Sequence, residues 1–107
     1  MKHLTLISHT NAQQDLADQL RGMEKQVSGF TFSHVEGHGV QVESDPFLSA
    51  RDKVVGYTPR VRVDILLEDG DVESVLDILR HTTSDAGSAD IYQGIYWITA
   101  VEQNGRL

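Results

Sequence analysis

The chain has 107 residues, which fits one compact domain spanning residues 1–107 and excludes a multidomain enzyme. Nine basic and sixteen acidic side chains give a formal net charge of −7, which argues against a nucleic-acid partner, and the absence of cysteine excludes disulfides, thiolate metal sites and cysteine nucleophiles. No apolar stretch approaches the roughly 18 residues of a membrane span, so we expect a cytoplasmic protein that does not insert into a membrane.

The first third of the chain predicts a strand, a helix and a second strand. Alternating apolar residues favour a strand over 3–8. Asn11 is a helix-capping residue type, and the apolar residues after it recur at helical spacing, so we expect a helix that extends to Val27 and stops at Gly29. The segment 30–36 alternates again and predicts the second strand. The apolar positions of the helix are Leu16, Leu20, Met23 and Val27.

The remaining two thirds predict a long loop, a strand, a helix, a second loop and a last strand. The polar segment from about 42 to 57 indicates a loop, and Pro59 then opens an alternation that predicts a strand. Acidic residues precede a helical spacing of apolar side chains that ends near His81. Residues 82–93 are polar and indicate a loop, and the apolar run 95–101 predicts the last strand.

This order, β-α-β-β-α-β, is typical of the α+β ferredoxin-like fold, a four-stranded antiparallel sheet with two helices on one face. The strand after Pro59 turns Arg60, Arg62 and Asp64 to the face away from its apolar residues. Such a mixed face is expected to be covered by another subunit. The aromatic residues of the last segment, Tyr92, Tyr96 and Trp97, are expected in the core or in a subunit interface.

Two patterns around the end of the second strand suggest binding rather than catalysis. Gly37 and Gly39 allow backbone angles that other residues avoid, so N–H groups there can face an anion, or the pair can simply form a bulge. His34, Glu36 and His38 alternate along a strand and have side chains that bind zinc or copper, although surface histidines are also common. No nucleophile elbow, phosphate loop or ordered acid–base set is present, so we do not expect an enzyme.

The segments VEGHGVQ (35–41) and VVGYTPRVRVD (54–64) resemble the PII signal-transduction proteins, matching their V-x-G-x-G-x-Q and V-V-x-x-x-P-K-x-x-I-E patterns. The resemblance implies a homotrimer of ferredoxin-like subunits that binds a small effector in the clefts between subunits. It also implies a long T-loop, here about residues 42–57, that engages a partner protein such as a membrane transporter. The chain is similar to a divergent branch of this family, some members of which are associated with heavy-metal efflux systems.

Carried over to this sequence, the resemblance places the effector near five residues and the partner near the long loop. The family's Gly-rich loop ending in lysine, which holds ATP phosphates, has no counterpart in residues 82–93. We therefore expect a small anionic effector, a carboxylate or monophosphate, rather than ATP. A divalent-metal-binding trimer similar to the CutA-type proteins, with His34, Glu36 and His38 as ligands, is the alternative. The effector residues are Gly37, His38, Gly39, Gln41 and Arg60, and the partner-binding residues are Phe47, Arg51 and Lys53.

Overall fold

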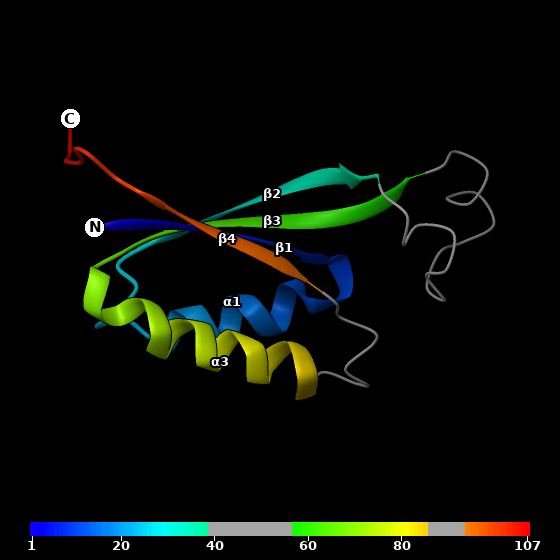
Figure 1. The fold of residues 1–107 in the computed structure, drawn as a ribbon. Coiled ribbons are helices and arrows are strands. Elements are labelled where there is room, and N and C mark those ends of the chain that lie inside the picture. The colour runs from blue at the N-terminus through cyan, green and yellow to red at the C-terminus, as the bar shows by residue number, and fades with distance from the viewer. Residues whose placement is uncertain (39–56, 86–93) are drawn as a thin grey trace.

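The computed structural model describes residues 1–38, 57–85 and 94–107. In these residues the chain forms one four-stranded antiparallel sheet with two α-helices on one face, the α+β ferredoxin-like arrangement that the sequence predicts (Figure 1). The elements in chain order are β1 (Lys2–His9), the 3-10 helix η1 (Thr10–Ala12), α1 (Gln13–Arg21), β2 (Phe30–Gly37), β3 (Thr58–Leu67), the 3-10 helix η2 (Asp69–Asp71), α3 (Val72–Asp85) and β4 (Ile95–Ala100).

The strand order β2-β3-β1-β4 makes β3 and β1 the central strands and leaves β2 and β4 at the edges. The register places Thr5 of β1 opposite Asp64 of β3 on one side and opposite Trp97 of β4 on the other. Residues paired in this way share a face of the sheet, so these three side chains lie on the face away from the helices. We refer to that face as the open face.

The core lies between the other face of the sheet and the two helices. Four residues of β3 that face the helices are at most 1% exposed, which explains the strict alternation of this strand. The apolar positions expected for the helices are buried as well, and this prediction is confirmed. The strand residues are Val61, Val63, Ile65 and Leu67, and the helix-side residues are Leu16, Leu20, Met23, Val27, Val72, Val75, Leu76 and Leu79.

Both helices differ from the sequence prediction at their ends. Helix α1 ends at Arg21 rather than near Val27, and Gly22 follows it with its N–H bonded to Asp18 O at 3.1 Å. Val27 still reaches the core because its N–H donates to Met23 O at 2.8 Å, which closes a turn. Helix α3 continues to Asp85, so the first four residues of the predicted loop 82–93 are helical. The capping prediction for Asn11 is also wrong, because its N–H donates to the His9 side chain at the start of η1.

Strand β4 differs from its neighbours because all six of its residues are exposed. Of the two expectations for Tyr96 and Trp97, a place in the core is wrong, because their side chains are 45% and 40% exposed, and a place in a subunit interface stays a prediction. Tyr92 lies outside the described residues. In the part of the chain that the structure describes, neither helix has the length and apolar character needed to span a bilayer.

Candidate functional site

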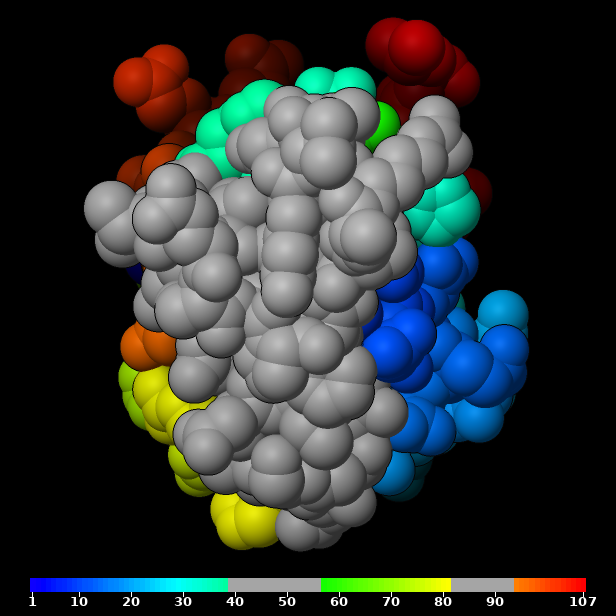
Figure 2. Space-filling model, turned by 90° about the vertical axis from the view of Figure 1, so that its right-hand side faces the viewer, coloured from blue at the N-terminus to red at the C-terminus, as the bar shows by residue number. Residues whose placement is uncertain are grey.

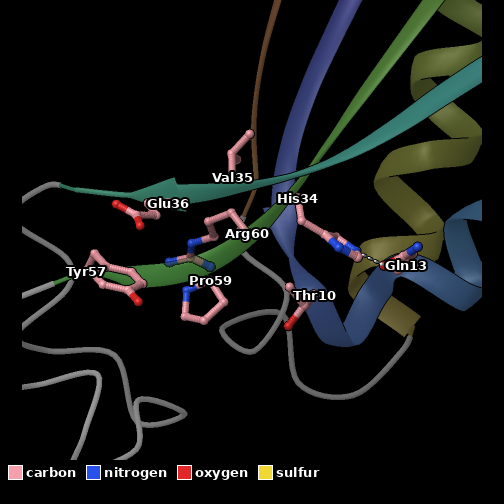
Figure 3. A pocket seen from close by; sticks show the side chains of 8 residues that line it. All are labelled: Thr10, Gln13, His34, Val35, Glu36, Tyr57, Pro59 and Arg60. Atoms are coloured by element: carbon pink, nitrogen blue, oxygen red, sulfur yellow. Dashed lines mark hydrogen bonds between the residues drawn. The ribbon is translucent and has the colours of Figure 1, made fainter. Parts of the chain in front are cut away.

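A groove opens at the end of the sheet where β2 ends and β3 begins. It has a volume of about 540 Å³ and lies between these strands and the start of α1. Figure 2 looks onto this end of the molecule, where the turquoise end of β2 lies above the blue start of α1. We call this site the β2–β3 groove. Its lining residues are Thr10, Gln13, His34, Val35, Glu36, Tyr57, Pro59 and Arg60 (Figure 3).

The polar wall of the groove joins β2 to the first residues after β1. His34 is paired with Val61 in the sheet register, so it lies on the helix side of β2. Its Nε2 is 2.9 Å from Gln13 Oε1, and Figure 3 shows the ring directed toward α1. Thr10 of η1 lies beside this contact and lines the same wall. Sequence reasoning missed Gln13 and Thr10, because only the tertiary packing brings η1 and α1 to the end of β2.

Gly37 and Arg60 meet at the strand end of the groove. A Cβ atom on Gly37 would lie 2.8 Å from Arg60 Cγ and 3.2 Å from the carbonyl oxygen of Thr58. The Arg60 side chain therefore passes over a position that only glycine fills without displacement. We expected Gly37 to serve through unusual backbone angles, but it is the last residue of regular strand β2, and its role is to allow this close approach.

Glu36 and His38 form a pair at the rim of the groove. Glu36 Oε2 lies 3.4 Å from His38 Nε2, and both side chains are more than 60% exposed. The His38 ring also lies 5.7 Å from the ring of Tyr57, centroid to centroid. Residues 1–38, 57–85 and 94–107 contain no set of three His, Cys, Asp or Glu side chains placed to hold a metal ion. In the metal hypothesis, Glu36 and His38 are thus near each other, whereas His34 faces Gln13.

Several predicted site residues lie outside the described residues, which omit 39–56. The structure therefore brings together His34, Glu36, Gly37, His38 and Arg60 from the predicted set at one end of the sheet. The predicted residues that it does not describe are Gly39, Gln41, Phe47, Arg51 and Lys53.

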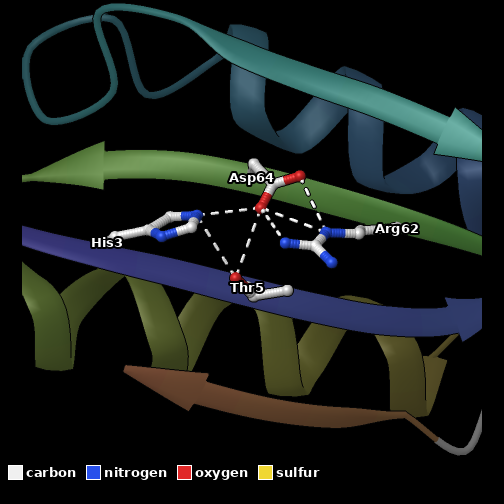
Figure 4. Close-up of polar contacts among 4 residues, drawn as sticks. All are labelled: His3, Thr5, Arg62 and Asp64. Carbon is white, nitrogen blue, oxygen red and sulfur yellow. Dashed lines mark hydrogen bonds and ion pairs between the residues drawn. The ribbon is translucent and has the colours of Figure 1, made fainter. Parts of the chain in front are cut away.

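A second polar group, on the open face, was not predicted from the sequence. It consists of His3, Thr5, Arg62 and Asp64, and we call it the open-face cluster (Figure 4). Asp64 Oδ1 lies 2.8 Å from His3 Nε2, and Arg62 Nε donates to Asp64 Oδ2 at 3.1 Å. Burial alone would raise the pKa of Asp64, but the hydrogen bonds from Arg62 and His3 outweigh it and lower this pKa below its usual range.

The open-face cluster resembles a nucleophile–base–acid set in composition but not in geometry. Thr5 Oγ1 and Asp64 Oδ1 both contact the same ring nitrogen of His3, at 3.2 Å and 2.8 Å. A relay needs the hydroxyl and the carboxylate on opposite nitrogens of the ring. Because the ionised carboxylate accepts the proton that Nε2 carries, this nitrogen cannot also accept a proton from Thr5, which itself is fully buried. The cluster is therefore suited to holding β1 and β3 in register.

A second, smaller cavity of about 380 Å³ adjoins the open-face cluster. His3 and Asp64 line it together with Arg106 from the C-terminal segment. Arg106 therefore adds a cation to the cavity that the His3–Asp64 contact lines. The other lining residues come from the segment before β2, from the first two residues of β2 and from β3.

The whole chain matches a family model described as "Protein of unknown function (DUF3240)", over residues 1–107. The chain therefore belongs to this family. It is also similar to the crystal structure of a DUF3240 family protein from Shewanella baltica OS155, with a TM-score of 0.75 and 21% sequence identity. That match covers 99% of this chain and 94% of the other, and it supports the fold described above.

Proposed function

We propose that this member of the DUF3240 family is a non-enzymatic regulatory protein that binds a small anionic effector in the β2–β3 groove. The observation that carries the proposal is the groove itself, because it combines an arginine, a histidine and apolar walls at the point where the chain enters and leaves residues 39–56. Its volume of about 540 Å³ lies within the range of small-molecule sites, which runs from about 300 to 1,000 Å³.

The lining favours a ligand with one anionic group and a small apolar part. Arg60 supplies the positive charge, and a charge-assisted hydrogen bond to a carboxylate or phosphate contributes about 1.5 to 3 kcal/mol. Val35, Pro59 and Tyr57 supply apolar contact beside it. Glu36 also lines the groove, and its carboxylate disfavours a second and third phosphate. A carboxylate or monophosphate therefore fits the charges better than a triphosphate.

The position of the groove beside both ends of residues 39–56 supports the proposed regulatory role. Gly37 precedes residues 39–56 and Tyr57 follows them, and both lie at or beside Arg60. A ligand that binds one arrangement of Gly37 and Tyr57 better than another shifts the population of the protein toward that arrangement. In the proposed function, residues 42–57 then engage a partner protein in the cytoplasm, such as a membrane transporter or a metal-efflux system. The protein works as a homotrimer, with effectors bound in the clefts between its subunits. The resemblance to PII proteins supports these last features.

Titration calorimetry with ATP-Mg, AMP, bicarbonate and succinate tests the effector proposal. We expect AMP, bicarbonate or succinate to bind, and we expect ATP-Mg to bind weakly. Arg60→Ala should reduce the affinity at least about tenfold, since a lost charge-assisted bond exceeds 1.4 kcal/mol. Arg21→Ala is the matched control. Arg21 is exposed on α1, so this substitution removes the same charge at a distance from the groove. Equal loss in both variants, or no binding of any anion, would contradict the proposal.

A second candidate function is divalent-metal binding, favoured by the pair that Glu36 and His38 form at the rim of the groove. Zinc or copper titration of the wild type and of the double variant His34→Ala/His38→Ala tests it. For this candidate, we expect the double variant to lose metal binding and to keep the oligomeric state of the wild type. Metal affinity equal to that of the wild type would remove these histidines from consideration.

A further inference from the structure

In residues 1–38, 57–85 and 94–107, strand β4 is an edge strand without the usual protection. Among the described residues it pairs with β1 and has no strand on its other side. Its sequence, IYWITA, contains no charge and no proline, and Ile95 is 62% exposed. Natural edge strands are commonly protected by a lysine, a proline, a bulge or a covering segment, since unpaired N–H and C=O groups recruit other strands. An apolar, uncharged edge of this length therefore indicates a surface that is covered in the working protein.

Two aromatic side chains of β4 each contact an arginine, one on each face of the sheet. On the open face, the Arg62 guanidinium lies 6.0 Å from the centre of the Trp97 ring. On the helix side, Arg80 donates from Nη2 to the Tyr96 hydroxyl at 3.0 Å and lies 5.6 Å from the ring centre. Tryptophan, tyrosine and arginine dominate the binding energy of protein interfaces. Side chains that are already ordered lose less conformational entropy when a partner binds.

The charges around β4 favour a second copy of this chain as the partner. The protein has a formal net charge of −7, so most contacts between two copies bring like charges together. At β4 this repulsion is small, because the strand is uncharged and the two nearby arginines are each paired with a carboxylate. Arg62 lies 3.1 Å from Asp64, and Arg80 lies 3.2 Å from Asp77. Two copies of this uncharged patch can therefore meet without bringing like charges together, as a contact between identical chains requires.

We propose that the exposed edge of β4, with Trp97 and Tyr96 on its two faces, is the surface on which a second copy of this chain binds by strand addition. The contact extends the sheet through backbone hydrogen bonds and removes the aromatic rings from water. The proposal rests on the self-association in the proposed function and names its surface, but it does not depend on the effector, so the measurement of mass tests it separately from the binding of anions.

The matched variants Ile95→Lys and Ile78→Lys test this surface. Both replace an exposed isoleucine, at 62% and 37% exposure, by the same cation. Ile78 lies two residues before Arg80 on α3, which places it about 160° around the helix from the residue that contacts β4. Analytical ultracentrifugation over a concentration series gives the mass of each protein. Trp97 is the only tryptophan of the chain, so its fluorescence reports directly whether this strand is covered.

We expect the wild type to self-associate and its Trp97 emission to shift to longer wavelength as dilution separates the copies. Ile95→Lys should raise the apparent dissociation constant at least about tenfold, with Trp97 emission at long wavelength, whereas Ile78→Lys should behave as the wild type. If Ile95→Lys does not fold by circular dichroism, Thr99→Lys on the same face of β4 replaces it.

Three outcomes would overturn the proposal. The first is a wild type that stays monomeric at high concentration with Trp97 exposed. The second is a monomer with short-wavelength emission at every concentration, which would place other residues of the same chain over β4. The third is equal dissociation in Ile95→Lys and Ile78→Lys. A dimer instead of a trimer would support the β4 surface and contradict only the homotrimer of the proposed function.

Discussion

Replacing Asp64 by asparagine removes the acceptor that joins the open-face cluster. Asp64 accepts hydrogen bonds from His3 Nε2 at 2.8 Å, from Thr5 Oγ1 at 3.3 Å and from Arg62 at 3.1 to 3.3 Å. Asparagine has nearly the same shape, but its carboxamide carries no charge and presents an N–H₂ group where one carboxylate oxygen accepted. The variant therefore changes the electrostatics of the cluster with little change in packing.

The expected cost follows from the burial of the carboxylate and the charge of its partners. A hydrogen bond to a charged group contributes about 1.5 to 3 kcal/mol to stability. Because the Asp64 side chain is still 28% exposed, water replaces part of what is lost, and the lower end of that range applies. We expect Asp64→Asn to lower the free energy of unfolding by about 1.5 kcal/mol at pH 7. For a domain of this size that corresponds to a decrease in Tm of roughly 6 to 10 °C.

The difference in the free energy of unfolding between the wild type and Asp64→Asn should decrease as the pH falls. The pKa of Asp64 is lowered in the folded protein, so its contribution is fully present above the ordinary aspartate pKa of 3.8 and is lost as the pH falls toward the lower folded value. Urea unfolding of both proteins at pH 7 and at pH 3, at one protein concentration, measures this. Asp18→Asn, at an exposed carboxylate on α1, is the control and should match the wild type. A stability of Asp64→Asn equal to that of the wild type at pH 7, or a difference that stays constant down to pH 3, would refute the reasoning.

Two further substitutions test the packing of the fold by urea unfolding. Gly37→Ala should destabilise the protein by about 1 to 3 kcal/mol, because its Cβ would lie 2.8 Å from Arg60 Cγ and 3.2 Å from a backbone oxygen; an unchanged stability would show that both atoms move freely. Leu20→Ala should cost about 2 to 5 kcal/mol, because Leu20 is 1% exposed in the core, and Leu66→Ala, at a residue 44% exposed, should cost clearly less; equal costs would contradict the assignment of the core.

The order of the elements could be predicted from the sequence because the sheet and the helices bury only one side each. Strand β3 alternates strictly since its odd-numbered residues from Val61 to Leu67 are at most 1% exposed, and period-2 burial of that kind is visible in the residues alone. The end of α1 could not be predicted in the same way. Met23 and Val27 continue the helical spacing and are buried, yet the chain has already left the helix at Gly22. Apolar spacing reports which side chains reach the core, and a turn satisfies it as well as a helix does.

The candidate site could be predicted only where its residues lie on one strand. His34 and Glu36 follow from the strand period, whereas Arg60 was expected at the effector site through the resemblance to the PII proteins. The open-face cluster could not be found in this way, because it depends on the pairing of Thr5 with Asp64 across a sequence separation of 59 residues. The register of two strands is set by the packing of the whole core, and no local pattern in either strand specifies it.

The two proposals meet in one last experiment, because they concern opposite edges of the same sheet. The groove is lined by β2 and β3, so the order β2-β3-β1-β4 leaves β1 between it and β4, and β3 and β4 are roughly 10 Å apart at 4.8 Å per strand. Within one chain, changes this far apart act independently. A closed trimer requires a head-to-tail contact, in which β4 of one copy meets a different surface of the next.

If that surface includes the β2 edge, the neighbouring copy completes the groove. We then expect Ile95→Lys to weaken the binding of AMP by about as much as Arg60→Ala does. The double variant should bind AMP no more weakly than either single variant. Calorimetry of the three variants measures this. Unchanged AMP affinity in a dissociated Ile95→Lys protein would show that the groove is complete in one chain, and would remove the intersubunit cleft from the proposed function while leaving the β4 surface intact.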